Sequence, residues 1–139
     1  MIVVDTSVVY ALADRGDADH GRAVDWIGTV RTNLVTTPLA VAEMDHMIST
    51  LGGAEAAAAL YEDLTSGVYL VEWWAGAMRD TIEVARRHSK LGLGLADCSL
   101  VALADHMSTT VIATLDERHF RLVKARNGAA FTILPADSR

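Results

Sequence analysis

The chain has 139 residues, of which 51% are hydrophobic and 22% are charged, and its formal net charge is -6 at pH 7. This length suits a single domain over residues 1–139, and this composition excludes a disordered chain or a fibrous repeat. The acidic balance excludes a protein that is held on nucleic acid by its overall charge.

The predicted strands and helices alternate along most of the chain. Short β-branched or alternating apolar runs predict strands, and apolar residues three and four apart predict helices. Thr37 before Pro38 predicts a helix start, because a proline at the first helical position gives up only an N–H that would have no partner. In chain order the predicted elements are strand 2–4, helix 8–14, a helix that begins at 16–17 and carries apolar residues to 30, strand 33–36, helix 38–52, helix 55–64, strand 68–71, helix 75–89, helix 96–106, strand 111–114 and strand 131–134.

The alternation of these elements favours an α/β fold. Strands that are separated by helices are joined by crossover connections, and crossovers produce parallel neighbours. We therefore expect a mostly parallel sheet that helices cover on both faces.

Three further features concern the surroundings in which the chain works. The longest aliphatic or aromatic runs, such as Val8 to Ala13, are far shorter than the roughly 18 residues that span a bilayer, so no membrane association is expected. A single cysteine, Cys98, excludes an intrachain disulfide and a cysteine-based zinc site. Residues after Met1 show neither a basic nor a long apolar leader, so we expect a cytoplasmic protein.

Four acidic residues stand at positions where chemistry is expected. Asp5 ends the first strand and Asp116 follows the fourth, at the edge of a parallel sheet where ligands bind. Glu43 and Asp97 interrupt helical faces that are otherwise apolar. Two carboxylates about 4 Å apart repel by roughly 4 kcal/mol at an effective dielectric near 20, so a converged group would need a cation. Oxygen ligands without cysteine suit Mg²⁺ or Mn²⁺.

Each acid also has an ordinary structural interpretation. Asp5 and Asp97 are suitable caps for the helices that follow them. Glu43 could face solvent, and Asp116 could be a turn residue. These interpretations are independent of one another, so together they explain the set of four less well than convergence does.

The same residues lie in motifs that resemble those of PIN-domain ribonucleases, and among these the VapC-type toxins of bacterial toxin-antitoxin pairs. The resemblance runs from Ile2 to about Leu134 and rests on four short motifs in a specific order. They are Asp5-Thr6-Ser7 after the first strand, Val41-Ala42-Glu43, Gly94-Leu95-Ala96-Asp97-Cys98-Ser99-Leu100-Val101-Ala102-Leu103-Ala104, and Thr114-Leu115-Asp116 with Phe120 four residues later.

The resemblance implies a three-layer α/β/α sandwich and phosphodiester hydrolysis of RNA by a metal-activated water, with 5′-phosphate and 3′-hydroxyl products. Asp116 would act through a metal-bound water. By this resemblance the catalytic and metal-binding residues are Asp5, Glu43, Asp97 and Asp116, with one or two Mg²⁺ or Mn²⁺ ions, and the residues that can contact water or phosphate are Thr6, Ser7 and Thr114.

The resemblance also implies partners. A VapB-type antitoxin would insert arginines among the carboxylates, because the planar guanidinium donates to two oxygens at once. Its apolar anchors are expected on the helices around Val8–Leu12 and Met44–Leu51. A homodimer is expected because the stretch Ala54–Leu60 carries more apolar residues than one sheet face can cover. RNA phosphates would be met by some of the basic residues Arg15, Arg22, Arg79, Arg86, Arg87, Lys90, Arg118, Arg121, Lys124 and Arg126.

Two other functions remain open at this point. A non-catalytic interaction module could use the acidic pocket only to capture arginines of a partner. An aspartyl-phosphate phosphatase also places an aspartate after its first strand, but it requires a second one where Ser7 stands here. Trp26, Trp73 and Trp74 are interpreted as core or oligomer contacts. The histidines lack the spacing of metal ligands and are interpreted as surface or partly buried residues: His20, His46, His88, His106 and His119.

Overall fold

A computed structural model describes residues 1–139 and contains one sheet of five parallel strands. The order of the strands across the sheet is β3-β2-β1-β4-β5, and every neighbouring pair is parallel. The predicted parallel sheet is therefore confirmed. The strands are β1 (Ile2–Val4), β2 (Leu34–Thr36), β3 (Tyr69–Val71), β4 (Val111–Ala113) and β5 (Thr132–Leu134).

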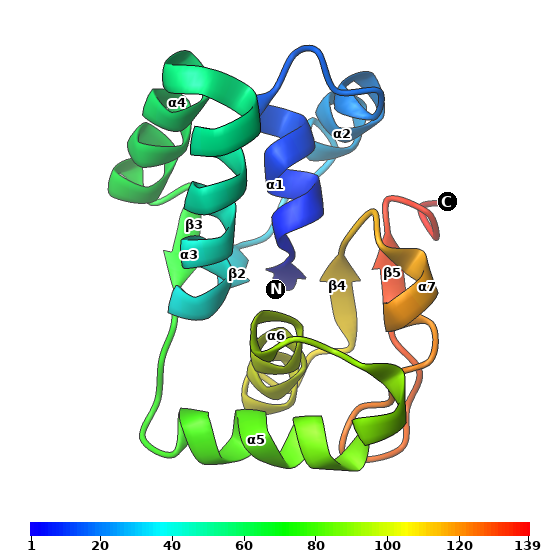
Figure 1. The fold of residues 1–139 in the computed structure, drawn as a ribbon. Coiled ribbons are helices and arrows are strands. Elements are labelled where there is room, and N and C mark those ends of the chain that lie inside the picture. Colours follow the sequence, from blue (N-terminus) through cyan, green and yellow to red (C-terminus); the bar gives the residue numbers. More distant parts are fainter.

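Helices cover both faces of this sheet, which gives the three-layer α/β/α sandwich (Figure 1). Helices α5 and α6 pack against each other on one side, while α1, α3 and α4 lie together on the other side of the view. The helices are α1 (Thr6–Ala13), α2 (His20–Ile27), α3 (Pro38–Met47), α4 (Gly53–Ser66), α5 (Ala77–Arg87), α6 (Leu95–His106) and α7 (Glu117–Phe120), with a π-helical turn η1 (Ile48–Gly52) and a 3₁₀ turn η2 (Ser89–Leu91).

The central strand β1 positions the start of the site. Its three residues are β-branched and completely surrounded, as expected of a parallel strand that is buried on both faces. Val3 pairs with β2 on one side and with β4 on the other. The chain therefore leaves the sheet at Asp5, in the middle of its carboxyl edge.

Helix α6 is the most deeply buried helix. Seven consecutive residues, Cys98 to Ala104, are buried, because the helix is apolar on all sides and packs between α3, α5 and β1. Only the two ends of the helix, Leu95–Asp97 and Asp105–His106, reach the surface. No helix of the structure combines the length and the apolar character needed to cross a membrane.

Two local predictions are wrong, and one short helix was not predicted. Helix α2 begins at His20 and ends at Ile27, because Asp14 and Asp17 accept hydrogen bonds from backbone N–H groups two residues ahead and hold 14–19 in turns. The third predicted helix changes to a π-helical turn after Met47. The short helix α7 was not predicted, because four residues show no periodicity.

Candidate metal centre

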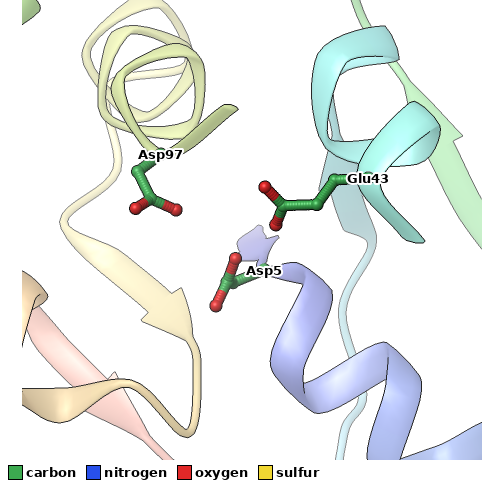
Figure 2. Close-up of side chains that lie close together, drawn as sticks. All are labelled: Asp5, Glu43 and Asp97. Atoms are coloured by element: carbon green, nitrogen blue, oxygen red, sulfur yellow. The ribbon is translucent and has the colours of Figure 1, made fainter. Parts of the chain in front are cut away.

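Three of the four predicted acids converge at the carboxyl edge of the sheet. Asp5 follows β1, Glu43 lies on α3, and Asp97 lies in the first turn of α6. One carboxylate oxygen of each residue lies within 4.8 Å of the corresponding oxygens of the other two. Figure 2 shows the three carboxyl groups pointing from separate elements into one space.

The cluster is closed at its base and open at its rim. Asp5 is 5% exposed, Asp97 is half-buried, and Glu43 is exposed to solvent. A ligand could therefore enter from the side of Glu43 and reach Asp5 at the bottom.

Two hydroxyl groups fix the orientation of the Asp5 carboxylate. Ser7 Oγ and Thr114 Oγ1 both donate to Asp5 Oδ2, at 2.8 Å and 2.7 Å. Each hydroxyl also accepts a backbone N–H, from Leu115 and Asp116 respectively. Asp5 occupies the N-cap position of α1, but its side chain makes no capping hydrogen bond there. Because both donors bind Oδ2, Oδ1 is the oxygen left for a ligand.

Thr6 has a different environment from Ser7 and Thr114. Its side chain is 2% exposed, and its Oγ1 donates to the carbonyl oxygen of Ala40 on α3. The Thr6 hydroxyl is therefore bonded to the backbone of α3, whereas those of Ser7 and Thr114 are bonded to Asp5.

Asp97 carries the clearest electrostatic sign of a crowded acidic site. Helix α6 begins at Leu95, so Asp97 lies inside the first turn, and the interpretation of Asp97 as a cap is wrong. Burial, and after it the negative charges of Asp5, Glu43 and Asp116, together raise the pKa of Asp97 to about 7. Without a cation, this carboxyl group holds a proton near neutral pH.

Asp116 stands beside the cluster rather than within it. It precedes α7, where its Oδ1 accepts the backbone N–H of His119 and its Oδ2 lies 2.8 Å from His119 Nδ1. Both side chains are about 40% exposed. Asp116 is near enough for its charge to act on Asp97, but its carboxylate is engaged by His119. The sequence analysis missed the contact between Asp116 and His119. The signal that could have revealed it is an aspartate that follows a strand and stands three residues before a histidine.

The three clustered carboxylates have no basic partner within the protein. None of the ion pairs of the structure includes Asp5, Glu43 or Asp97. Two such charges repel by roughly 4 kcal/mol at 4 Å and an effective dielectric near 20, so a bound cation would relieve a large cost. A donor set made only of carboxylate oxygens fits Mg²⁺ or Mn²⁺.

A groove of about 340 Å³ lies near this centre, between α1 and α4. Its floor is apolar and its rim is mainly acidic, with three carboxylates against one guanidinium. Val9 lines the groove four residues after Asp5, so the groove begins about 6 Å along α1 at 1.5 Å per residue. The residues that define this α1–α4 groove include Leu12, Ala13, Ala56, Ala59 and Leu60 on the floor and Asp14, Arg15, Glu55 and Asp63 on the rim.

The two stretches that the sequence predicted for partner anchors, Val8–Leu12 and Met44–Leu51, are partly buried. Val8 and Val9 on α1 are buried in the core, as are Met44 and Ile48 on α3 and η1. Of these four side chains only Val9 also lines the α1–α4 groove. Each predicted stretch also has an accessible end: Leu12 borders the groove, and Leu51 is 67% exposed.

Comparisons with known proteins agree with this fold. The model of the PIN domain family matches residues 2–125. The chain is 31% identical over 135 residues to Ribonuclease VapC26 of Mycobacterium tuberculosis, an alignment that covers 96% of this chain and 100% of that protein. The crystal structure of VapC20 from the same organism, a sarcin-ricin loop cleaving toxin, superposes with a TM-score of 0.78 at 24% identity, covering 84% of this chain and 91% of that chain. FitAcB from Neisseria gonorrhoeae gives a TM-score of 0.61 at 24% identity, covering 95% and 97%.

Proposed function

The chain belongs to the PIN-domain family, and we propose that it is a Mg²⁺- or Mn²⁺-dependent endoribonuclease that serves as the toxin of a toxin-antitoxin pair. The observation that carries the proposal is the convergence of Asp5, Glu43 and Asp97 without a basic partner, at an edge of the sheet that is open to solvent. The similarity to a protein named as a ribonuclease supports RNA as the substrate, and we propose the cytoplasm as the place of action.

In this mechanism Asp5, Glu43 and Asp97 would hold the metal. When bound, the ion supplies a Lewis acid that activates water for in-line attack on a phosphodiester and stabilises the leaving oxygen. Ser7 and Thr114 keep Asp5 Oδ1 turned toward the site by occupying Oδ2. Asp116 acts at the rim through a water, with its carboxylate held by His119. The expected products carry a 5′-phosphate and a 3′-hydroxyl.

Incubation of the purified protein with total RNA, followed by mapping of the new ends, tests this function. Cleavage should occur with Mn²⁺ or Mg²⁺ and stop with EDTA, and Asp5→Asn should suppress it while the protein stays folded. The rival function, a non-catalytic pocket that captures arginines, predicts intact RNA under every condition. Full cleavage in EDTA would contradict the metal mechanism.

We also propose a VapB-type antitoxin as the partner. Its arginines would enter the acidic cluster, and apolar anchors on the same chain would bind the α1–α4 groove, since an exposed ion pair alone gives little affinity. The groove favours a basic chain because Asp14, Glu55 and Asp63 outnumber Arg15 along its rim.

A homodimer is the second proposed assembly. Of the stretch Ala54–Leu60, Ala56, Ala57 and Leu60 are buried within the chain, which weakens the original argument from that helix. Larger exposed apolar side chains cluster instead on and around the edge strand β3: Val68, Leu70, Val71 and Trp73, each 37–45% exposed. Light scattering at micromolar concentration should give twice the chain mass, and a monomer would contradict this assembly.

A further inference from the structure

Buried hydroxyl groups are concentrated beneath the acidic cluster. The buried serines and threonines are Thr6, Thr36, Thr37, Thr81, Ser99 and Thr114, and all except Thr81 bond to Asp5 or to segments that carry the acids. A buried hydroxyl stabilises a fold less simply than an apolar side chain, because it must find a partner to offset the loss of water. This concentration points to a role at the site.

Thr37 and Ser99 form the one bond among these groups that joins helices α3 and α6 through their side chains. Their oxygens lie 2.7 Å apart, and both residues are completely buried. Thr37 caps α3 and accepts the N–H of Ala40, while Ser99 donates to the carbonyl oxygen of Ala96. Because the Ser99 hydroxyl donates its single proton to the carbonyl oxygen of Ala96, the Thr37 hydroxyl is the donor in its bond to Ser99.

The result is a directed relay from Ala40 N–H through Thr37 and Ser99 to the carbonyl of Ala96. The relay starts one turn before Glu43 and ends at the residue before Asp97. Hydrogen bonds in such a chain polarise and strengthen one another. The apolar contacts between the same helices are not directional, so they permit small displacements that the relay opposes.

We propose that Thr37 and Ser99 are positioning residues that set the separation of Glu43 and Asp97, and thereby the affinity of the centre for a divalent cation. This inference rests on the proposed function. Mg²⁺ requires near-ideal octahedral geometry, and a supporting shell must hold such ligands within about 0.5 Å. Neither hydroxyl touches the ion or the substrate.

The test compares Ser99→Ala, Thr37→Val and Thr37→Ser with Thr81→Val as the matched control. Thr81 is equally buried and donates to Ala77 within α5, away from the acids. Thermal unfolding reports the structural cost of each change, and calorimetric titration of Mn²⁺ in the absence of RNA reports the centre itself.

Ser99→Ala and Thr37→Val should weaken Mn²⁺ binding by about 10-fold, the lower end of what loss of an outer partner costs a metal site. The double variant should be no weaker than either single variant, because both changes break one relay. Thr37→Ser keeps the hydroxyl, so it should bind Mn²⁺ as tightly as the wild type does, unlike Thr37→Val. Thr81→Val should lower the unfolding temperature without changing Mn²⁺ affinity.

Two results would separate the possible failures. If Ser99→Ala binds Mn²⁺ as tightly as Thr81→Val does, the relay is only structural and the inference is overturned, while the proposed function stands. Ser99→Ala decides this alone if Thr37→Val does not fold. If the wild-type protein binds no Mn²⁺ at all, the proposed function fails and this inference fails with it.

Discussion

At the scale of single residues, Asp97 shows how repulsion between the carboxylates of the site affects folding stability. Burial and the neighbouring carboxylates raise the pKa of Asp97 to about 7, against 3.8 for an isolated aspartate. Between these values the folded chain binds a proton that the unfolded chain does not. Folding stability from this group is therefore greatest at low pH and falls as the pH rises toward about 7.

This sign leads to a prediction for Asp97→Asn. In metal-free protein at pH 8, the variant should be more stable than the wild type by roughly 1 kcal/mol, or about 3–5 °C, because a half-exposed charge is partly screened by solvent. The gain should vanish near pH 4, where Asp97 is protonated. Thermal unfolding at the two pH values measures it, and a loss of stability at pH 8 would contradict the account. The same variant should lose RNA cleavage.

A metal competes with the proton for Asp97, so the affinity for Mn²⁺ should rise with pH. The increase should be steepest below about pH 7 and flatten above it, as Asp97 becomes ionised. Calorimetric titrations at several pH values measure this dependence. An affinity independent of pH between 5.5 and 8 would show that Asp97 is not a ligand.

At the scale of elements, local sequence patterns predicted the helices and strands that are determined by interactions between neighbouring residues. Buried strands such as Ile2–Val4 were predictable from β-branched runs, and the start of α3 was predictable from Thr37-Pro38. The loop before α2 and the helix α7 were not, because side-chain bonds of Asp14, Asp17 and Asp116 define them.

The candidate site divides in the same way. Strand ends and interrupted apolar faces singled out four acids, and the resemblance to PIN-domain ribonucleases implied that they converge. Three of them, Asp5, Glu43 and Asp97, do so. The orientation of Asp5 by Thr114, 109 residues away, was not predictable, because it depends on the pairing of β1 with β4. The sequence also gave no means to distinguish a ligand from a rim residue at Asp116, since a carboxylate serves either role.

Helix α7 gives a prediction at this scale. Asp116 caps the helix by accepting the N–H of His119. Asparagine caps a helix almost as well as aspartate, whereas alanine costs about 1 kcal/mol. Asp116→Ala should therefore lower the unfolding temperature and Asp116→Asn should not, while Asp116→Asn reduces cleavage less than Asp5→Asn does. Equal stability of the two Asp116 variants would contradict the capping role.

At the scale of the whole molecule, the proposed antitoxin would contact both the acidic cluster and the α1–α4 groove. A partner that only paired with exposed charges would bind weakly, and one that only filled the groove would leave the carboxylates free. A chain that does both can bind tightly and exclude metal. Helix α1 connects the two places, since Asp5 precedes it and Leu12 and Ala13 border the groove.

This arrangement predicts the effect of a charge placed in the groove. Ala59→Glu should weaken rescue of cell growth by the antitoxin, because it buries a carboxylate against the apolar anchors of the partner. Ala58→Glu is the matched control, since Ala58 is exposed on the same helix and lies outside the groove. Growth on co-expression measures both, and equal rescue would exclude the groove as an anchor site. Replacing the arginines of the antitoxin tail by alanine should also weaken rescue.

The central claim is that Asp5, Glu43 and Asp97 together bind the divalent cation that RNA cleavage requires. Anomalous scattering from crystals grown with Mn²⁺ tests it most directly. The account predicts a manganese peak between the three carboxylates, with oxygens of Asp5, Glu43 and Asp97 at about 2.1 Å. Well-diffracting crystals with no peak at this position, or with the metal held by other residues, would contradict it.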